Sequence, residues 1–286
     1  YNPEQGYFVT ANQDLNEYGT ARPSNLPMGP YRAERIAELL EEGTQLSCSD
    51  MYALHHDVYS RQAKAFMEVI TPLLPDTPAG RLLKEWDCRY TADSKGAWLF
   101  KEFYRTLYQE VFGKHGFGPA ATLHLATHTG IFNDFYLNFD RVLLSTESAW
   151  FNGSKREELF QRALNSTLAR EPLTWGQSQQ LMLSHILFGG RLPRWLGFDR
   201  GPITLIGDLA TPHQGQIFES AGRKTCFAPS LRMVIDLSTD EVHTNIPGGP
   251  SDRRFSRWYC SDLQNWIDGK YKILSPDSGQ ALLPFP

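Results

Sequence analysis

The first twelve residues combine a turn sequence with a short run that favours extended backbone. The sequence NPEQG is typical of a turn, and the YFVT that follows is aromatic or β-branched. This pattern predicts a strand over Gly6–Asn12. The next stretch, Gln13–Pro30, holds three prolines and predicts an irregular loop, long enough to serve a function, that leads into a helix.

Apolar residues recur at helical spacing between residues 31 and 169. Pro30 at the entry and Gly43 at the exit delimit a helix that starts at Tyr31. A second helix, capped by Ser49, is predicted to continue to about Pro72 with its apolar residues on one side. The same spacing predicts further helices over 80–86, 97–112, 134–145 and 155–169.

Beyond residue 200 the pattern becomes strand-like. Runs rich in β-branched and aromatic residues alternate with Gly, Pro, Asp and Ser, and predict strands over 203–206, 225–227, 231–237 and 242–246. A last helix is predicted over Tyr259–Ile267, ended by Gly269. We expect an α+β fold with a strand and site loop in residues 1–30, a mainly helical part in 31–200, and strands with a final helix in 201–286.

Composition narrows the class of protein. With 286 residues, of which 41% are hydrophobic and 21% charged, the chain is expected to fold. A net charge of -4 and a pI near 6.1 give no general attraction to nucleic acid or to an anionic membrane, and the sequences RKT and DRR are too short to supply one. No apolar run approaches the roughly 20 residues that span a bilayer.

Four cysteines are scattered along the chain, at Cys48, Cys88, Cys226 and Cys260. No two of them form a CxxC pair, which excludes a zinc ribbon and a thioredoxin-like motif. We expect most of them to be free, while a disulfide such as Cys226–Cys260 stays open.

The sequence HLATH would place His124 and His128 on one face of a helix, as in a metalloprotease helix. Leu125 stands where the general-base Glu is required, so the pattern favours a structural role for both histidines. The chain also lacks GxSxG, a Walker loop and GxGxxG. These absences argue against an α/β-hydrolase, a P-loop nucleotide-binding protein and a Rossmann dehydrogenase.

Asn12 has a more specific chemical interpretation. A carboxamide at the end of a strand, directly before an irregular loop, can project its N–H group into a cleft and donate to an oxyanion. Removing such a donor from an acyl-transfer enzyme lowers kcat by about 100- to 1000-fold. Taken alone, however, an Asn at the end of a strand is more often a turn residue.

Several motifs in sequence order resemble the penicillin amidase family over nearly the whole chain. They are NPEQGYFVTAN (2–12), GPYRAERIAELL (29–40), WDCRYTADSKGAWLF (86–100), FDRGPITLIGD (198–208), PSLRMVIDLS (229–238) and IPGGPS (246–251). The resemblance implies a four-layer αββα amide hydrolase of the N-terminal-nucleophile (Ntn) class. Autocatalytic cleavage would leave a Ser at the start of its β chain, whose α-amino group, with a reference pKa of about 7.7, serves as general base for the Ser hydroxyl.

The resemblance also implies roles for individual residues. Asn12 matches the oxyanion-hole asparagine, and Arg32 matches the arginine that fixes the geometry of the site, with Arg35 and a plain helix-surface charge as alternatives. Tyr1 has no aliphatic hydroxyl or thiol, so it is not the nucleophile. We therefore expect this chain to be the carboxy-terminal part of the β chain, with the α chain and the start of the β chain as its partner.

The expected function is hydrolysis of a linear amide, either the side-chain amide of a β-lactam or an N-acyl-homoserine lactone. The alternative is a non-catalytic remnant or binding module that retains the fold. No cofactor is expected. Some relatives bind calcium, but Asp14 and Glu17 do not map clearly onto a ligand, so no metal is assigned. A periplasmic or secreted location is implied by the family alone.

Overall fold

The computed structural model describes residues 2–20, 27–43, 45–114, 116–129, 131–220 and 223–275. Helix α1 (Tyr31–Glu42) begins after Pro30 and ends before Gly43, as predicted. The helix predicted from Ser49 to Pro72 is instead two helices, α2 (Cys48–His55) and α3 (Arg61–Ile70).

A non-local pairing separates α2 from α3. The Tyr90 amide donates to the Val58 carbonyl and the Ser60 amide to the Cys88 carbonyl, both at 3.0 Å. The Val58 carbonyl and the Ser60 amide therefore bond to a distant segment rather than within a continuous helix. Each helix has its own cap: Ser47, not Ser49, caps α2, and Ser60 caps α3.

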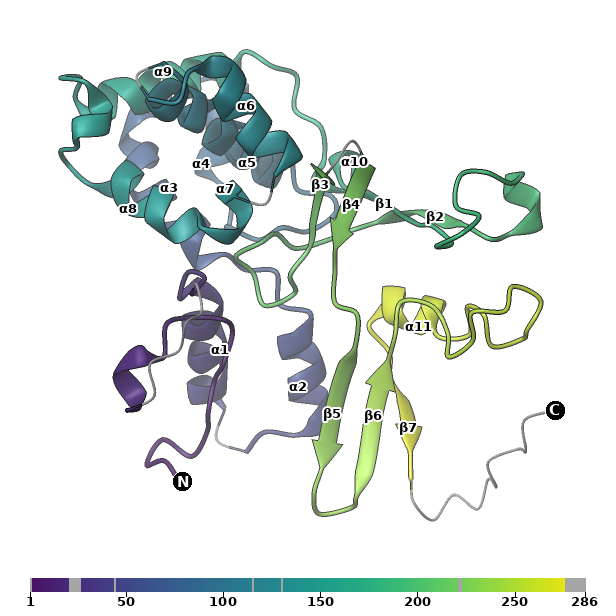
Figure 1. The fold of residues 1–286 in the computed structure, drawn as a ribbon. Coiled ribbons are helices and arrows are strands. Elements are labelled where there is room, and N and C mark those ends of the chain that lie inside the picture. The colour runs from purple at the N-terminus through teal and green to yellow at the C-terminus, as the bar shows by residue number, and fades with distance from the viewer. Residues whose placement is uncertain are drawn as a thin grey trace.

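The remaining predicted helices are present within a few residues of their expected bounds. They are α4 (Pro78–Lys84), α5 (Lys95–Tyr108), α8 (Tyr136–Leu144) and α9 (Arg156–Leu168), joined by α6 (Pro119–His128), α7 (Ile131–Asp134) and α10 (Trp175–Ser178). A π-helical turn (Gln109–Gly113) extends α5, and short 3-10 turns cover 16–18, 71–73, 149–151 and 194–196. Helices α3 to α9 form one block (Figure 1).

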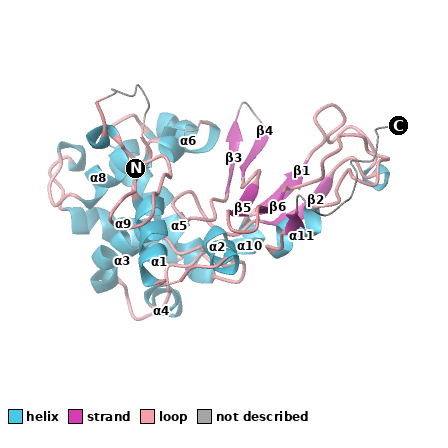
Figure 2. Cartoon of the chain, turned by 90° about the horizontal axis from the view of Figure 1, so that it is seen from below, coloured by secondary structure: helices cyan, strands magenta, loops and turns pink. Residues whose placement is uncertain are grey.

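The strands form three small antiparallel sheets beside this block (Figure 2). One pairs β1 (Gln180–Leu183) with β2 (Arg200–Thr204), and a second pairs β3 (Gln216–Ser220) with β4 (Arg223–Phe227). The third has the order β5 (Arg232–Asp236), β6 (Glu241–Asn245) and β7 (Lys272–Leu274). The predicted final helix is α11 (Leu263–Asp268), ended by Gly269 at a φ of 70°.

The amino-terminal strand predicted over Gly6–Asn12 is absent. Residues 7–10 belong to no sheet, and residues 11–12 form a bend. A strand exists through its ladder to a neighbour, and within the described part of the chain no other strand pairs with this segment. The prediction from β-favouring side chains was therefore wrong for this segment.

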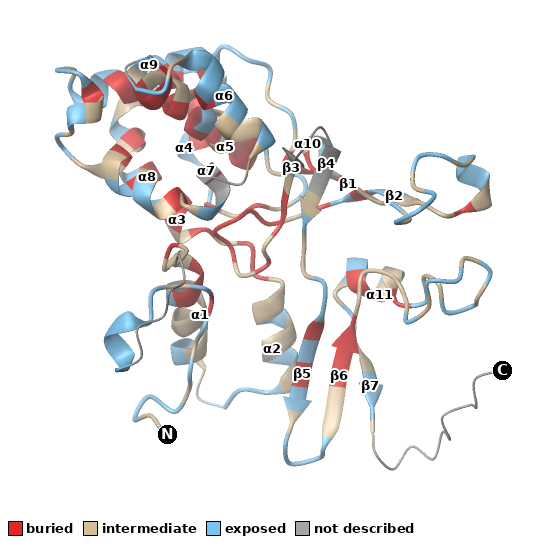
Figure 3. Cartoon of the chain, viewed as in Figure 1, coloured by how far each residue is buried: buried red, intermediate tan, exposed pale blue. Residues whose placement is uncertain are grey.

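The two faces of the β5–β6–β7 sheet have different surroundings. Val234 and Arg232 are buried on the face that packs against α2, whose Tyr52 contacts His243 of β6. On the other face Met233 and Ile235 are 49% and 46% exposed (Figure 3).

The described residues include no helix long and apolar enough to cross a membrane.

Candidate functional site

Asn12 lies at a bend that its neighbours hold by local hydrogen bonds. Its φ of 66° is in the left-handed region, which Asn tolerates better than most residues. The Gln13 side chain closes the bend, because its Oε1 accepts from the Ala11 amide at 2.6 Å and its Nε2 donates to the Val9 carbonyl at 3.0 Å. The backbone of Asn12 is thus fixed from both sides.

Arg32, in the first turn of α1, reaches back to this bend. Only 8% of the residue is exposed. Its Nη2 donates to the Ala11 carbonyl and to Asn12 Oδ1, both at 2.8 Å. The Met28 amide donates to the Asn12 carbonyl at 2.7 Å and brings the chain just before α1 against the bend. The two residues that the sequence singled out are therefore in direct contact.

This contact fixes the direction of the Asn12 carboxamide. A guanidinium has only donors, so the carboxamide oxygen must be the atom that faces Arg32. The amide nitrogen then faces away from Arg32, and Asn12 is an exposed residue. Among the residues that the structure describes, none accepts a hydrogen bond from Asn12 Nδ2. The bend thus presents an N–H donor that is free to meet an acceptor from outside.

Arg32 carries its charge in a largely apolar setting. Tyr136 is fully buried, stacks on Tyr31 with ring centres 6.1 Å apart, and donates from Oη to the Gly29 carbonyl at 3.3 Å. Burial lowers the pKa of Arg32, and Tyr136 opposes that shift. Arg32 Nε has no hydrogen-bond partner, and no carboxylate of the described residues forms an ion pair with this side chain. An unneutralised guanidinium beneath Asn12 favours negative charge beyond the carboxamide.

Arg35 serves a different purpose. Its Nε donates to Asp57 Oδ2 at 2.7 Å and its Nη1 to Glu38 Oε2 at 2.9 Å. Asp57 is buried and also pairs with Arg89 at 2.7 Å. Arg35 therefore ties α1 to the segment between α2 and α3, whereas Arg32 contacts Asn12.

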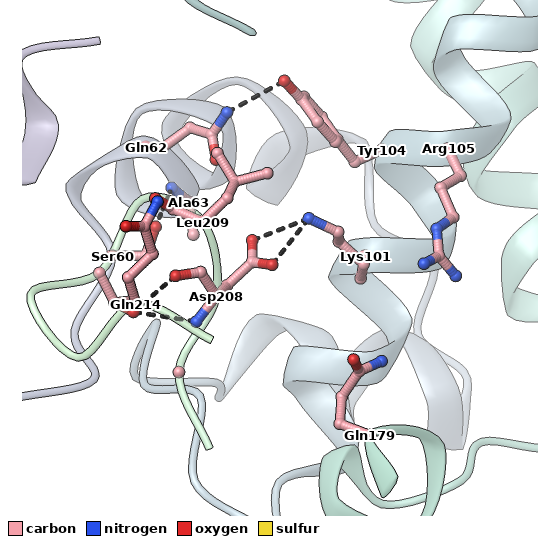
Figure 4. A network of polar contacts seen from close by, with 12 residues as sticks. Ser60, Gln62, Ala63, Lys101, Tyr104, Arg105, Gln179, Asp208, Leu209 and Gln214 are labelled. Atoms are coloured by element: carbon pink, nitrogen blue, oxygen red, sulfur yellow. Dashed lines mark hydrogen bonds and ion pairs between the residues drawn. The ribbon is translucent and has the colours of Figure 1, made fainter. Parts of the chain in front are cut away.

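The structure adds a buried ion pair that sequence reasoning missed. Lys101 Nζ of α5 lies 2.8 Å from both carboxylate oxygens of Asp208, which stands in the loop between β2 and β3 (Figure 4). Burial lowers the pKa of Lys101, and the charge of Asp208 opposes that shift. A signal was present in the sequence, because Asp208 ends the FDRGPITLIGD motif and Lys101 directly follows WDCRYTADSKGAWLF.

A second buried carboxyl lies within the helical block. Asp140 accepts hydrogen bonds from Gln62 Nε2 at 2.7 Å and from the Tyr104 hydroxyl. Burial raises its pKa to about 7, while these donors act in the opposite direction. Nothing in the spacing of the sequence pointed to Asp140.

A cleft of about 760 Å³ opens between α5, α6 and β3. Lys101, Arg105 and Tyr108 line it from α5, and Leu209 lines it from the loop after Asp208. Leu209 also packs with Tyr136, which lies next to Arg32. The cleft is thus connected through Leu209 and Tyr136 to the side chain that orients Asn12.

The structure shows where the paired histidines and the possible metal ligands lie. His124 and His128 lie on one face of α6 with ring centres 5.2 Å apart. Asp14 Oδ1 accepts from the Asn16 amide at 2.9 Å, which is a turn contact. Within the described ranges no three His, Cys, Asp or Glu side chains converge to hold a metal ion.

Tyr1 lies outside the described residues, and the four cysteines form no disulfide.

Comparison with known proteins places these features in context. A family model described as "Penicillin amidase" matches residues 1–280. The penicillin acylase 2 proenzyme of Pseudomonas sp. (strain SE83) is 26% identical over 283 residues, which cover 93% of this chain and 36% of that protein. The acyl-homoserine lactone acylase QuiP of Pseudomonas syringae pv. syringae (strain B728a) is 24% identical over 308 residues, covering 95% and 37%.

A solved structure shares the fold. The thermostable penicillin G acylase from Alcaligenes faecalis superposes with a TM-score of 0.61 at 15% identity, covering 96% of this chain and 54% of that one. This similarity confirms the expected mixed helix-and-sheet Ntn-hydrolase fold. The chain spans little more than a third of the length of the curated relatives that it matches. With nearly all of its residues matched by one family model, the chain belongs to the penicillin amidase family.

Proposed function

We propose that this chain is part of an acylase-type amide hydrolase in which Asn12 Nδ2 donates a hydrogen bond to the oxyanion of the tetrahedral intermediate. The observation that carries the proposal is the 2.8 Å contact from Arg32 Nη2 to Asn12 Oδ1, which turns the amide nitrogen outward. A donor held in place before the reaction needs no reorganisation as charge develops, and this makes it effective in catalysis. Arg32 is the positioning residue.

The nucleophile in this proposal is the Ser that begins the β chain in the family. Its hydroxyl proton passes to its own α-amino group as the oxygen attacks the amide carbonyl carbon. The carbonyl oxygen becomes an oxyanion, which Asn12 and backbone amides stabilise. The C–N bond then breaks, the amine leaves with the transferred proton, and water hydrolyses the resulting ester. Autocatalytic maturation of a longer precursor belongs to the same proposal.

The substrate class is a linear amide that joins an acyl group to an amine-bearing nucleus. The names of the relatives supply two candidates, the side-chain amide of a β-lactam and an N-acyl-homoserine lactone. Both contain the same scissile bond. Loss of the Asn12 donor should therefore lower turnover of either substrate by a similar factor.

Substitution of Asn12 in the complete, matured enzyme tests the donor. Asn12→Ala should lower kcat by about 100-fold or more and change KM less. Asn12→Asp keeps an oxygen for Arg32 but removes the N–H, so it should be equally impaired. Asn16→Ala, in the same loop but in a 3-10 turn, is the matched control and should retain activity. Unchanged kcat in matured Asn12→Ala enzyme would sink the assignment.

Arg32 is tested by comparison with its neighbour. Arg32→Lys replaces the guanidinium, whose Nη2 contacts both Ala11 and Asn12, with a single ammonium. It should lower kcat by about tenfold, because Asn12 is no longer held. Arg35→Lys alters the pair with Asp57 and should affect stability more than kcat. Equal kcat values for these two variants would show that Arg32 has no special role at Asn12.

The alternative function is that of a binding module or remnant that retains the family fold without catalysis. The DNA upstream of the Tyr1 codon distinguishes the two hypotheses. A Ser codon at an autocleavage junction supports the hydrolase, and a stop codon or unrelated sequence supports the remnant. The 286-residue chain alone should show no amidase activity, and turnover by it would contradict the proposed division of the site.

A periplasmic or secreted location completes the proposal. It rests on the family alone, and fractionation of the producing cells followed by detection of the chain tests it. Recovery in the cytoplasmic fraction alone would contradict it.

A further inference from the structure

Two loops far apart in sequence form one surface, which we call the loop pair. They are residues 184–200, which run from the end of β1 to the first residue of β2, and residues 251–262, which precede α11. Figure 1 shows both on the side of the molecule away from the helical block, and Figure 2 shows the same placement from below.

Specific contacts lock the two loops together. Arg254 Nε donates to the Leu196 carbonyl and the Tyr259 hydroxyl to the Phe198 carbonyl, both at 2.6 Å. Gly197, at this junction, has a φ of 69°, in the left-handed region that favours glycine. The loop pair is therefore a defined surface rather than two independent loops.

The charge of the loop pair is opposite in sign to that of the whole chain. It contains six arginines and three aspartates, a net charge of +3, against -4 for all 286 residues. Two of the aspartates are engaged: Asp199 accepts from the His185 and Gly190 amides, and Asp262 pairs with Lys272 at 2.5 Å. Within the described residues none of the six arginines forms an ion pair. Arg200 and Arg254 donate to backbone carbonyls within the loop pair. The other four arginines are exposed, and their charge is available to an anionic partner.

Large apolar side chains project from the same surface. Ile186, Trp195 and Phe255 are 94%, 81% and 84% exposed, and Trp258 is 48% exposed. The guanidinium of Arg257 lies over the Trp258 ring at 4.4 Å. Single exposed apolar residues are ordinary, but a group of them among unpaired arginines marks an interaction surface.

We propose that the loop pair docks on an anionic phospholipid surface. Its apolar residues stand on protruding loops, where indole, phenyl and aliphatic groups can enter the headgroup region while guanidinium groups bind phosphates. The basic surface would orient the otherwise acidic chain, because the remaining residues are repelled by the same lipids. The sequence DRR was too short to predict this alone; folding joins it to the arginines of RLPRW.

Co-sedimentation with sucrose-loaded vesicles tests the proposal. The purified 286-residue chain should bind phosphatidylcholine vesicles that contain phosphatidylserine, bind pure phosphatidylcholine weakly, and be released by salt. Arg253→Glu/Arg257→Glu and Trp195→Ala/Phe255→Ala should each lower the partition coefficient at least about tenfold. Spins without vesicles subtract any aggregated protein, and near-UV circular dichroism verifies that the variants fold.

Arg81→Glu/Arg141→Glu is the matched control, since it changes the net charge by the same amount at a distance from the loop pair and should bind as the parent chain does. Equal loss of binding in this control would show that overall charge alone matters and would overturn the proposal. So would failure of the parent chain to bind anionic vesicles. Retention on heparin that depends on Arg253 and Arg257, without vesicle binding, would assign the surface to a soluble polyanion instead.

Discussion

Large apolar residues are buried in the helical block but partly exposed on one face of the β5–β6–β7 sheet. In the block Phe66, Phe100 and Phe103 are buried and in ring contact with one another or with Phe160. In the sheet about half of Met233 and Ile235 is exposed. The helices of the block bury one another's apolar surface, whereas one face of the sheet is exposed to solvent or to a partner.

The difference teaches where stability resides in this chain. Burial of a Phe side chain contributes on the order of 2–3 kcal/mol, and α5 supplies several such residues to one core. The strands are three to five residues long and gain little from one-sided burial. The block should be the last part to unfold, and the open sheet face should promote aggregation.

Removal of the buried ion pair between the helical block and the loop that joins β2 to β3 should have the largest effect. Lys101→Met leaves Asp208 buried without its partner and should lower the free energy of unfolding by about 3–5 kcal/mol. Lys101→Met/Asp208→Asn should recover part of that loss, because no charge remains buried. Urea unfolding measures both, and a single variant as stable as the double variant would contradict the pairing.

A matched pair of truncations tests the contrast directly. Phe103→Ala removes a fully buried ring and should cost about 3–5 kcal/mol. Ile235→Ala should cost less than about 1 kcal/mol and reduce aggregation, because nearly half of the side chain is already in water. Equal costs would show that the Ile235 face is buried in solution.

The pH dependence of stability should depend on His213. This buried residue faces His56, His55 and Arg232, and burial with these charges lowers its pKa to about 3. The unfolded chain then binds the proton first, so stability falls as pH decreases from about 6.5 toward 3. His213→Asn should reduce this loss by about 3 kcal/mol between pH 6.5 and 4. The raised pKa of Asp140 has the opposite effect, because it makes stability increase as the pH decreases. The parent chain and the His213→Asn variant share this contribution, so it cancels in the difference between them.

The smallest effect concerns thiol reactivity. Burial raises the pKa of Cys88 to about 11, so its thiol should react slowly with an aromatic disulfide reagent in the native chain. After denaturation without reductant all four thiols should react, because the structure contains no disulfide. Titration of only two would establish a bond that the structure does not show.

Structural elements that depend on local sequence patterns were predicted correctly. The apolar spacing of α1, α5 and α9 was sufficient to locate them, and Gly269 marked the end of α11. Pairing between distant segments was not predictable: β1, β3 and β7 were missed, as was the ladder that separates α2 from α3. The strand predicted at residues 6–12 failed for the same reason, since side-chain preference does not supply a neighbour.

The residues of the candidate site also fall into two groups, those that the sequence identified and those that it did not. Asn12 and Arg32 were identified from motifs that resemble a family, and the structure brings them together. Their contact spans 20 residues and follows from a bend and a helix start that are both local. Lys101 and Asp208 are 107 positions apart, and no local pattern links them.

The contacts among Ala11, Asn12, Met28 and Arg32 have a consequence for evolution. They close the chain on itself at residues 11–12 and 28–32, so the loop that connects these points starts and ends at a fixed clasp. The entropy of such a closed loop changes only slowly with its length. Insertions or replacements within it can therefore accumulate without moving the amide of Asn12. Under the proposed function, substrate preference would then be free to diverge around an unchanged donor.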